Sequence, residues 1–126
     1  MEEWKLDFDW LRVRHIVKDA MHKKDLPDLQ SILYLIGIQE LGRWDAENSF
    51  TKEEKQDLMH IAVCTLLEPD GYFEFEGRDH DGWPHWKENK RFELKGIDNQ
   101  EEFLKGKVVQ YFSALEKLNG GFENKN

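Results

Sequence analysis

The sequence predicts a mainly helical α+β domain, in which three helices are followed by a β-hairpin and then by a C-terminal helix. Four stretches repeat apolar residues at helical spacing and carry capping or stop signals at their ends. Short strand-like stretches lie between the third and fourth of them, after the turn sequence Glu68-Pro69-Asp70-Gly71. Because a two-stranded ribbon is too marginal to stand alone, we expect it to lie against the helices.

The first helix is expected from about Asp7 to Lys23 and the second from about Leu26 to Leu41. Asp25 and Pro27 suit the start of the second helix, and Gly42 suits its end. The second helix is apolar almost all round, which indicates a central, buried helix. A buried strand is the competing interpretation for its middle residues.

The third helix is expected from Lys52 to Leu67, because Thr51 and Glu54 form a capping box at its start. The fourth is expected from Asn99 to Leu118, after a similar cap at Asp98. Its apolar stripe consists of Leu104, Val108, Tyr111, Leu115 and Leu118, with Phe103 and Phe112 at the flanks.

The two strands are expected at 72–76 and 91–95, joined by a long loop that begins at Gly77. That loop crowds charged, histidine and tryptophan side chains together, which is typical of a surface role. Aromatic residues beside arginine are favoured at interfaces. The candidate partner-binding residues are therefore Arg78, His80, Trp83, His85 and Trp86. A tryptophan also commonly covers the edge of a small core, so a structural lid stays open as the alternative.

The length of 126 residues indicates one domain, expected over residues 1–118, with a flexible tail over residues 119–126. The single cysteine, Cys64, excludes an internal disulfide and lies in an apolar run, as a small buried hydrophobe would. The start of the chain lacks the features of a signal peptide, and no apolar run is long enough to span a membrane. We therefore expect a cytoplasmic location.

The net charge of −8 disfavours binding to nucleic acid and to anionic membranes. Three helices followed by a hairpin approximate a winged helix, but the third helix begins with Lys52, Glu53, Glu54 and Lys55 and lacks a basic footprint. The acidic balance instead suits a basic protein partner or a cation.

A cation site is the second possibility. Placing Gly82 at the glycine position of an EF-hand loop makes Asp79, Asp81 and Glu88 the acidic ligands. The first ligand and the incoming helix are missing, so a non-helical site of these three acids is the better form of the hypothesis. In the alternative, the aspartates only bond nearby amides in a solvated turn. The histidines His15, His22 and His60 form no compact zinc motif.

No nucleophile elbow and no glycine-rich phosphate loop is present, so catalytic residues remain unassigned and no cofactor is expected. The sequence favours a small, acidic interaction module of adaptor or inhibitor type, monomeric or homodimeric. A cation-dependent enzyme or metal-binding protein using the Asp79–Glu88 loop is the alternative. A binder of carbohydrate or small molecules using Trp83 and Trp86 is the third interpretation.

Overall fold

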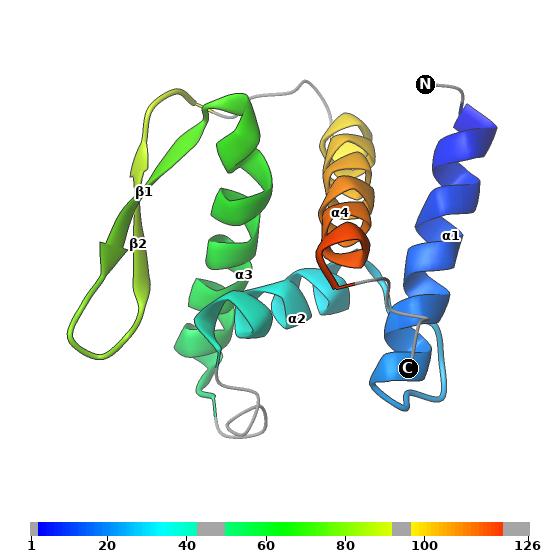
Figure 1. Cartoon of the computed structure of the whole chain (residues 1–126), viewed down its shortest axis with the longest axis horizontal. Helices are drawn as coiled ribbons and strands as arrows, with labels where there is room; N and C mark the ends of the chain where they lie inside the picture. The colour runs from blue at the N-terminus through cyan, green and yellow to red at the C-terminus, as the bar shows by residue number, and fades with distance from the viewer. Residues whose placement is uncertain (1–2, 43–49, 92–96, 120–126) are drawn as a thin grey trace. The chain divides into compact units, whose positions relative to one another are not determined.

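The computed structural model of the chain describes residues 3–42, 50–91 and 97–119. Its elements follow the predicted order of three helices, a two-stranded antiparallel hairpin and a C-terminal helix (Figure 1). They are α1 (Glu3–Ala20), α2 (Leu29–Leu41), α3 (Lys52–Leu67), the short 3-10 helix η2 (Glu68–Asp70), β1 (Phe73–Arg78), β2 (Pro84–Glu88) and α4 (Ile97–Asn119). The predicted mainly helical α+β class is confirmed. None of the described helices is long and apolar enough to cross a membrane.

The chain divides into two compact units. Unit 1 combines residues Met1–Leu29 with Leu94–Asn126 and thus contains α1 and α4, whereas unit 2 is the continuous stretch Gln30–Glu93. One domain over residues 1–118 and a flexible tail over 119–126 remain predictions, and residues 120–126 lie outside the described part of the chain.

Unit 1 is built on α1 and α4, which lie side by side (Figure 1). The buried residues of α1 share one helical face and are Trp10, Val13, Ile16 and Val17. On α4 the predicted stripe is only partly right, because Phe112 is buried with Val108 whereas Leu118 is 81% exposed. Near that end of α4 the contact with α1 is polar: the guanidinium of Arg12 donates to both carboxylate oxygens of Glu116, at 3.1 and 2.9 Å.

The C-terminus of α1 is closed by a residue in the left-handed region. His22 has a φ of 55°. Its amide donates to the Asp19 carbonyl, and the Lys23 amide donates to the Lys18 carbonyl at 2.9 Å. This is the Schellman arrangement, in which glycine usually occupies the position that His22 takes here. The helix therefore ends at Ala20, three residues before the predicted Lys23.

In unit 2, α2 is buried almost all round, as predicted. It begins at Leu29 and not at Leu26, and Gly42 closes it with a φ of 83°, as its stop signal indicates. Gly37 is in contact with the backbone of α3. A Cβ built on Gly37 would overlap the Leu58 carbonyl oxygen and lie 2.6 Å from its carbon.

The third helix has the predicted bounds and the predicted cap. The Thr51 hydroxyl accepts from the Glu54 amide at 3.1 Å, and the Glu54 carboxylate accepts from the Thr51 amide at 2.9 Å. Two amides that the helix itself cannot satisfy are thereby paired.

The hairpin differs from the prediction in its second strand. β1 pairs with Pro84–Glu88, which was predicted to lie inside the loop, and not with residues 91–95. Arg91 is outside any strand, and residues 92–95 lie outside the described part of the chain. An irregularity between Phe75 and Gly77 inserts Glu76 as an extra residue. The hairpin lies alongside α3 (Figure 1). The Phe73 ring packs edge-on against the His60 ring of α3.

Candidate functional site

The residues singled out in the sequence gather on the hairpin, where a short turn replaces the expected long loop. The Gly82 amide donates to the Asp79 carbonyl, and the Asp79 amide donates to the Trp83 carbonyl, both at 2.9 Å. Gly82 has a φ of 90°, which glycine adopts without strain. The turn thus spans only three residues, 80–82, in the three-residue hairpin geometry.

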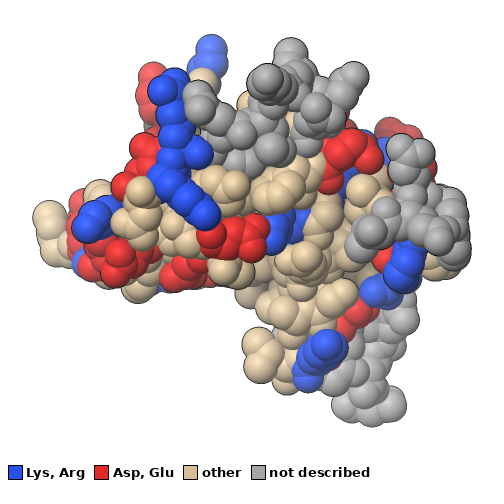
Figure 2. Space-filling view, turned by 90° about the horizontal axis from the view of Figure 1, so that it is seen from above, with Lys and Arg blue, Asp and Glu red and all other residues tan. Residues whose placement is uncertain are grey.

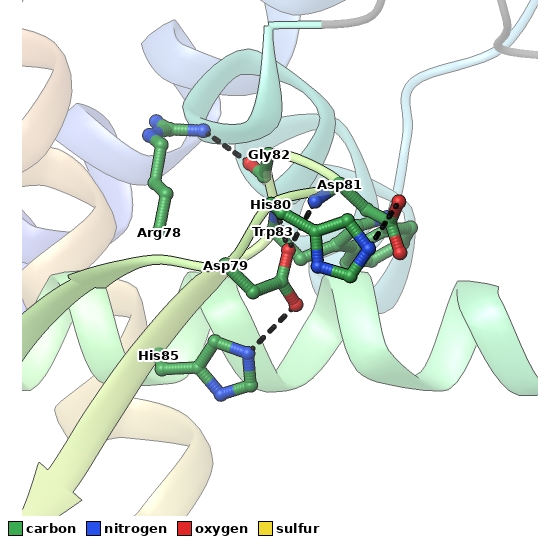
Figure 3. Close-up of polar contacts among 7 residues, drawn as sticks. All are labelled: Arg78, Asp79, His80, Asp81, Gly82, Trp83 and His85. Carbon is green, nitrogen blue, oxygen red and sulfur yellow. Dashed lines mark hydrogen bonds and ion pairs between the residues drawn. The ribbon is translucent and has the colours of Figure 1, made fainter.

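The side chain of Asp79 organises this turn (Figure 3). One carboxylate oxygen accepts from the amides of Asp81 and Trp83, both at 3.0 Å. The other lies 2.9 Å from Nε2 of His85. Because an ionised carboxylate only accepts, His85 must donate from Nε2. These bonds, with that from His85 first, hold the pKa of Asp79 below its usual value.

Arg78 ties the turn to the end of α2. Its guanidinium donates to the Gly82 carbonyl at 2.8 Å, as Figure 3 shows. It also donates to the carbonyls of Glu40 and Leu41, at 2.6 and 3.4 Å. The last carbonyls of a helix have no partner within it and carry partial negative charge, so a guanidinium satisfies them well. Arg78, a candidate for partner binding, is therefore engaged with the protein's own backbone.

The two histidines and the second aspartate are more exposed. His80 and Asp81 lie at the tip of the turn, with Nε2 of His80 3.7 Å from the Asp81 carboxylate. His85 lies on the solvent side of β2, where its side chain bonds across the turn to Asp79. Of the predicted residues, this pair of His80 and Asp81 is presented most fully to solvent.

The two tryptophans are half-buried and each packs edge-on against a different phenylalanine. The Trp83 ring lies 6.3 Å from that of Phe50, and the Trp86 ring lies 5.2 Å from that of Phe75. Nε1 of Trp86 is buried without a hydrogen-bond partner. Both rings thus contribute to packing within unit 2.

The three acids of the cation hypothesis are not brought together. Asp79 and Asp81 belong to the turn, but Glu88 is at the far end of β2, paired with Phe73. Across residues 3–42, 50–91 and 97–119, no group of three or more histidine, cysteine, aspartate or glutamate side chains is placed to hold a metal. The amide bonds of Asp79 match the alternative of a solvated turn.

The cysteine on α3 is unsuited to nucleophilic chemistry. Cys64 is fully buried, with its sulfur 3.5 Å from Nε2 of His60. Burial, with a smaller contribution from the charge of Glu88, raises the pKa of the thiol to about 12. A reactive cysteine needs a stabilised thiolate, and this setting opposes one.

One surface feature, on β1, was not predicted from the sequence. Phe75 is 44% exposed, and its neighbours Glu74 and Glu76 are exposed as well. The sequence offers no clear signal for it, because Phe73-Glu74-Phe75-Glu76 alternates cleanly and alternation alone places Phe75 on the buried face with Phe73. The described residues of unit 2 carry eleven acidic and six basic side chains. Acidic side chains dominate the left end of Figure 2, where the hairpin lies.

Comparison with protein-family models, with curated proteins and with solved structures finds no match to this chain.

Proposed function

We propose that this protein is an interaction module, of adaptor or inhibitor type, that binds a basic protein partner through β1 of the hairpin. The observation that carries the proposal is the exposure of Phe75 between two exposed glutamates. Aromatic side chains are enriched among the residues that anchor interfaces. Acidic neighbours select a positively charged partner and speed its approach.

The side chains of Glu74, Phe75 and Glu76 also suit arginine and lysine side chains of a partner. A cation on the Phe75 side of the ribbon gains attraction from the aromatic ring, and a cation on the opposite side is attracted by Glu74. The location proposed with this function is the cytoplasm, where the free thiol of Cys64 stays reduced.

Co-purification with the tagged full chain tests the proposal. The test variant reverses the charge of the two residues beside Phe75, with Glu74→Lys and Glu76→Lys. The control variant, Asp7→Lys with Asp19→Lys, makes the same change in charge at two exposed positions of α1. Quantitative mass spectrometry should find basic proteins enriched by the wild type and the control, and lost from the test variant.

Two results would contradict the proposal. One is that no basic protein is enriched above background by the wild type. The other is equal loss in both variants, which would make the effect one of overall charge and not of the hairpin.

A further inference from the structure

The pattern of hydrogen bonds between β1 and β2 shows which backbone groups of the hairpin face outward. The Asn89 amide donates to the Tyr72 carbonyl at 2.9 Å, just before the pair Phe73–Glu88. Directly opposed residues in an antiparallel pair alternate between hydrogen-bonded and non-hydrogen-bonded pairs. Phe73 and Phe75 therefore fall at non-hydrogen-bonded pairs, and their amide and carbonyl groups point away from β2.

Within the described part of the chain, the outer edge of β1 is open at Phe75. The sheet has two strands within the described residues, so no third strand covers this edge there. No described residue forms a backbone hydrogen bond with the outward groups of Phe75. Unpaired groups at a sheet edge readily accept another extended chain.

The outer edge of β2 is less suited to a new strand. By the same alternation, the pair Arg78–Pro84 is non-hydrogen-bonded, because the next pair, Asp79–Trp83, shares a hydrogen bond. The nitrogen of Pro84 thus faces outward, and proline has no N–H to donate. Proline at such a position blunts an edge strand, so β1 is the edge that can receive a partner.

The side chains of β1 specify what would bind there. Phe73 and Phe75 share the face of the ribbon that lies toward α3, and Glu74 lies on the opposite, solvated face. A strand beside β1 places its own side chains alternately on the same two faces. Apolar residues of that strand would meet Phe75, and basic residues would meet Glu74 and the nearby Glu76.

A second copy of the chain fits this edge less well than a basic segment. Pairing β1 with β1 of another molecule would bring Glu74 and Glu76 close to the same residues of the partner. Like charges on neighbouring strands destabilise the pairing.

We propose that the partner contributes an extended segment of alternating basic and apolar residues, which adds to the outer edge of β1 as a third strand. This rests on the proposed function and deepens it, because it gives the form in which the basic partner is recognised. Main-chain hydrogen bonds would supply affinity, and the alternating side chains would supply selectivity.

Synthetic peptides test this mode directly. The probe is Lys-Val-Lys-Val-Lys-Val-Lys-Val, compared with one version N-methylated at every valine and another N-methylated at every lysine. All three keep the same charges, but each methylated peptide loses the donors on one edge of its strand. Isothermal titration should show roughly tenfold or greater loss of affinity for one methylated peptide only. The peptide methylated at valine should lose affinity if the peptide binds antiparallel to β1. The peptide methylated at lysine should lose affinity if it binds parallel.

A matched pair of protein variants tests the hydrogen bond that the backbone amide of Phe75 would donate to the peptide. Phe75→Ala and Phe75→Pro both remove the ring, but only the proline variant also removes the outward amide. Phe75→Pro should bind the unmethylated peptide at least roughly tenfold more weakly than Phe75→Ala. Because that amide does not serve the β1–β2 ladder, unchanged far-ultraviolet circular dichroism checks that both variants fold.

Hydrogen exchange completes the test. The Phe75 amide should exchange rapidly in the free protein and become protected with the peptide. Protection in the free protein would overturn the proposal, since the edge would already be occupied; if it accompanies a dimer by sedimentation, the occupant is a second copy. Equal binding of all three peptides, or of both variants, would also overturn strand addition. The proposed function would stand in that case, provided that binding still depends on Glu74 and Glu76.

Discussion

Unit 2 and unit 1 hold their helices together in different ways. In unit 2, α2 meets α3 at Gly37, so close that the backbone of Leu58 occupies the space of a side chain. In unit 1, α1 and α4 meet through side chains, and one of their contacts is the ion pair of Arg12 with Glu116. Side-chain contacts can adjust by rotation, whereas a backbone contact leaves little room to adjust.

The ends of the helices show the same contrast. α2 is closed by Gly42, for which a positive φ costs little, and its last carbonyls also accept from Arg78. α1 is closed by His22, which takes a similar conformation with a side chain in place. Unit 2 thus uses the residue types best suited to its geometry, whereas unit 1 carries some local strain. Substitutions should therefore cost stability at the close contacts of unit 2 and can add stability at the strained helix end of unit 1.

The largest effect is expected from Gly37→Ala. The added methyl group overlaps the Leu58 backbone, so the two helices must separate, and we expect the free energy of unfolding to fall by about 3 kcal/mol or more. Urea denaturation measures this. Gly106→Ala on α4 is the matched control, because a Cβ there meets no described atom within 4 Å. The control should be neutral or stabilising by up to about 1 kcal/mol. Equal midpoints for the two variants would refute the close helix crossing.

Removing the guanidinium of Arg78 should have the next largest effect. Arg78→Ala leaves the carbonyls of Glu40 and Leu41 without this donor and frees the turn. Because the site is partly solvated, we expect a loss of about 1–2 kcal/mol in urea denaturation. Lys87→Ala, which removes an exposed cation from the same hairpin, is the control. A loss no greater than that of the control would show that the three bonds contribute little.

His22→Gly should stabilise the protein. Glycine removes the cost of a side chain in the left-handed region and keeps the Schellman bonds, so we expect a gain of roughly 0.5–1 kcal/mol. A higher thermal midpoint would reveal it. A lower midpoint would mean that the imidazole makes a contribution larger than the strain.

The smallest effect concerns Asp79 and is read from its dependence on pH. The folded-state pKa of this carboxyl is lowered, so its contribution to stability is present above the ordinary aspartate value of about 4 and is lost as the pH falls through the folded-state pKa. Asp79→Asn should lower the thermal midpoint at pH 6, and the difference from the wild type should shrink as the pH falls below the ordinary aspartate value. Since Arg12 lowers the pKa of Glu116 as well, the difference between wild type and variant is the informative quantity. A difference that does not change with pH would contradict the role given to the carboxylate.

The helices were predictable because their signals are local. The capping box of Thr51 and Glu54 and the stop at Gly42 need only neighbouring residues, and both are present. The early end of α1 was not predictable, because histidine is an uncommon residue at a left-handed helix end.

The second strand was predicted at the wrong residues because a proline such as Pro84 usually interrupts a strand. In the structure its nitrogen faces the outer edge, where a missing donor costs the ladder nothing. The dipeptide Asp81-Gly82 was the signal for a tight hairpin, since aspartate followed by glycine is typical of such turns.

The candidate site was predictable only within the turn. That an aspartate here bonds nearby amides is a local tendency, and Asp79 does so. The bonds of Arg78 to Glu40 and Leu41 join residues 38 and 37 positions apart, which no local pattern reports. The exposure of Phe75 depends likewise on how the hairpin lies against α3.

The order of the two units along the chain has a consequence for biosynthesis. Unit 2 is one continuous stretch, so its helices and hairpin can assemble as soon as residue 93 has left the ribosome. Unit 1 joins Arg12 to Glu116, 104 positions later, so its two helices can pair only after α4 is made. During that interval unit 2 can be complete while α1 still lacks its partner helix, and an unpaired apolar helix is a substrate for a ribosome-bound chaperone.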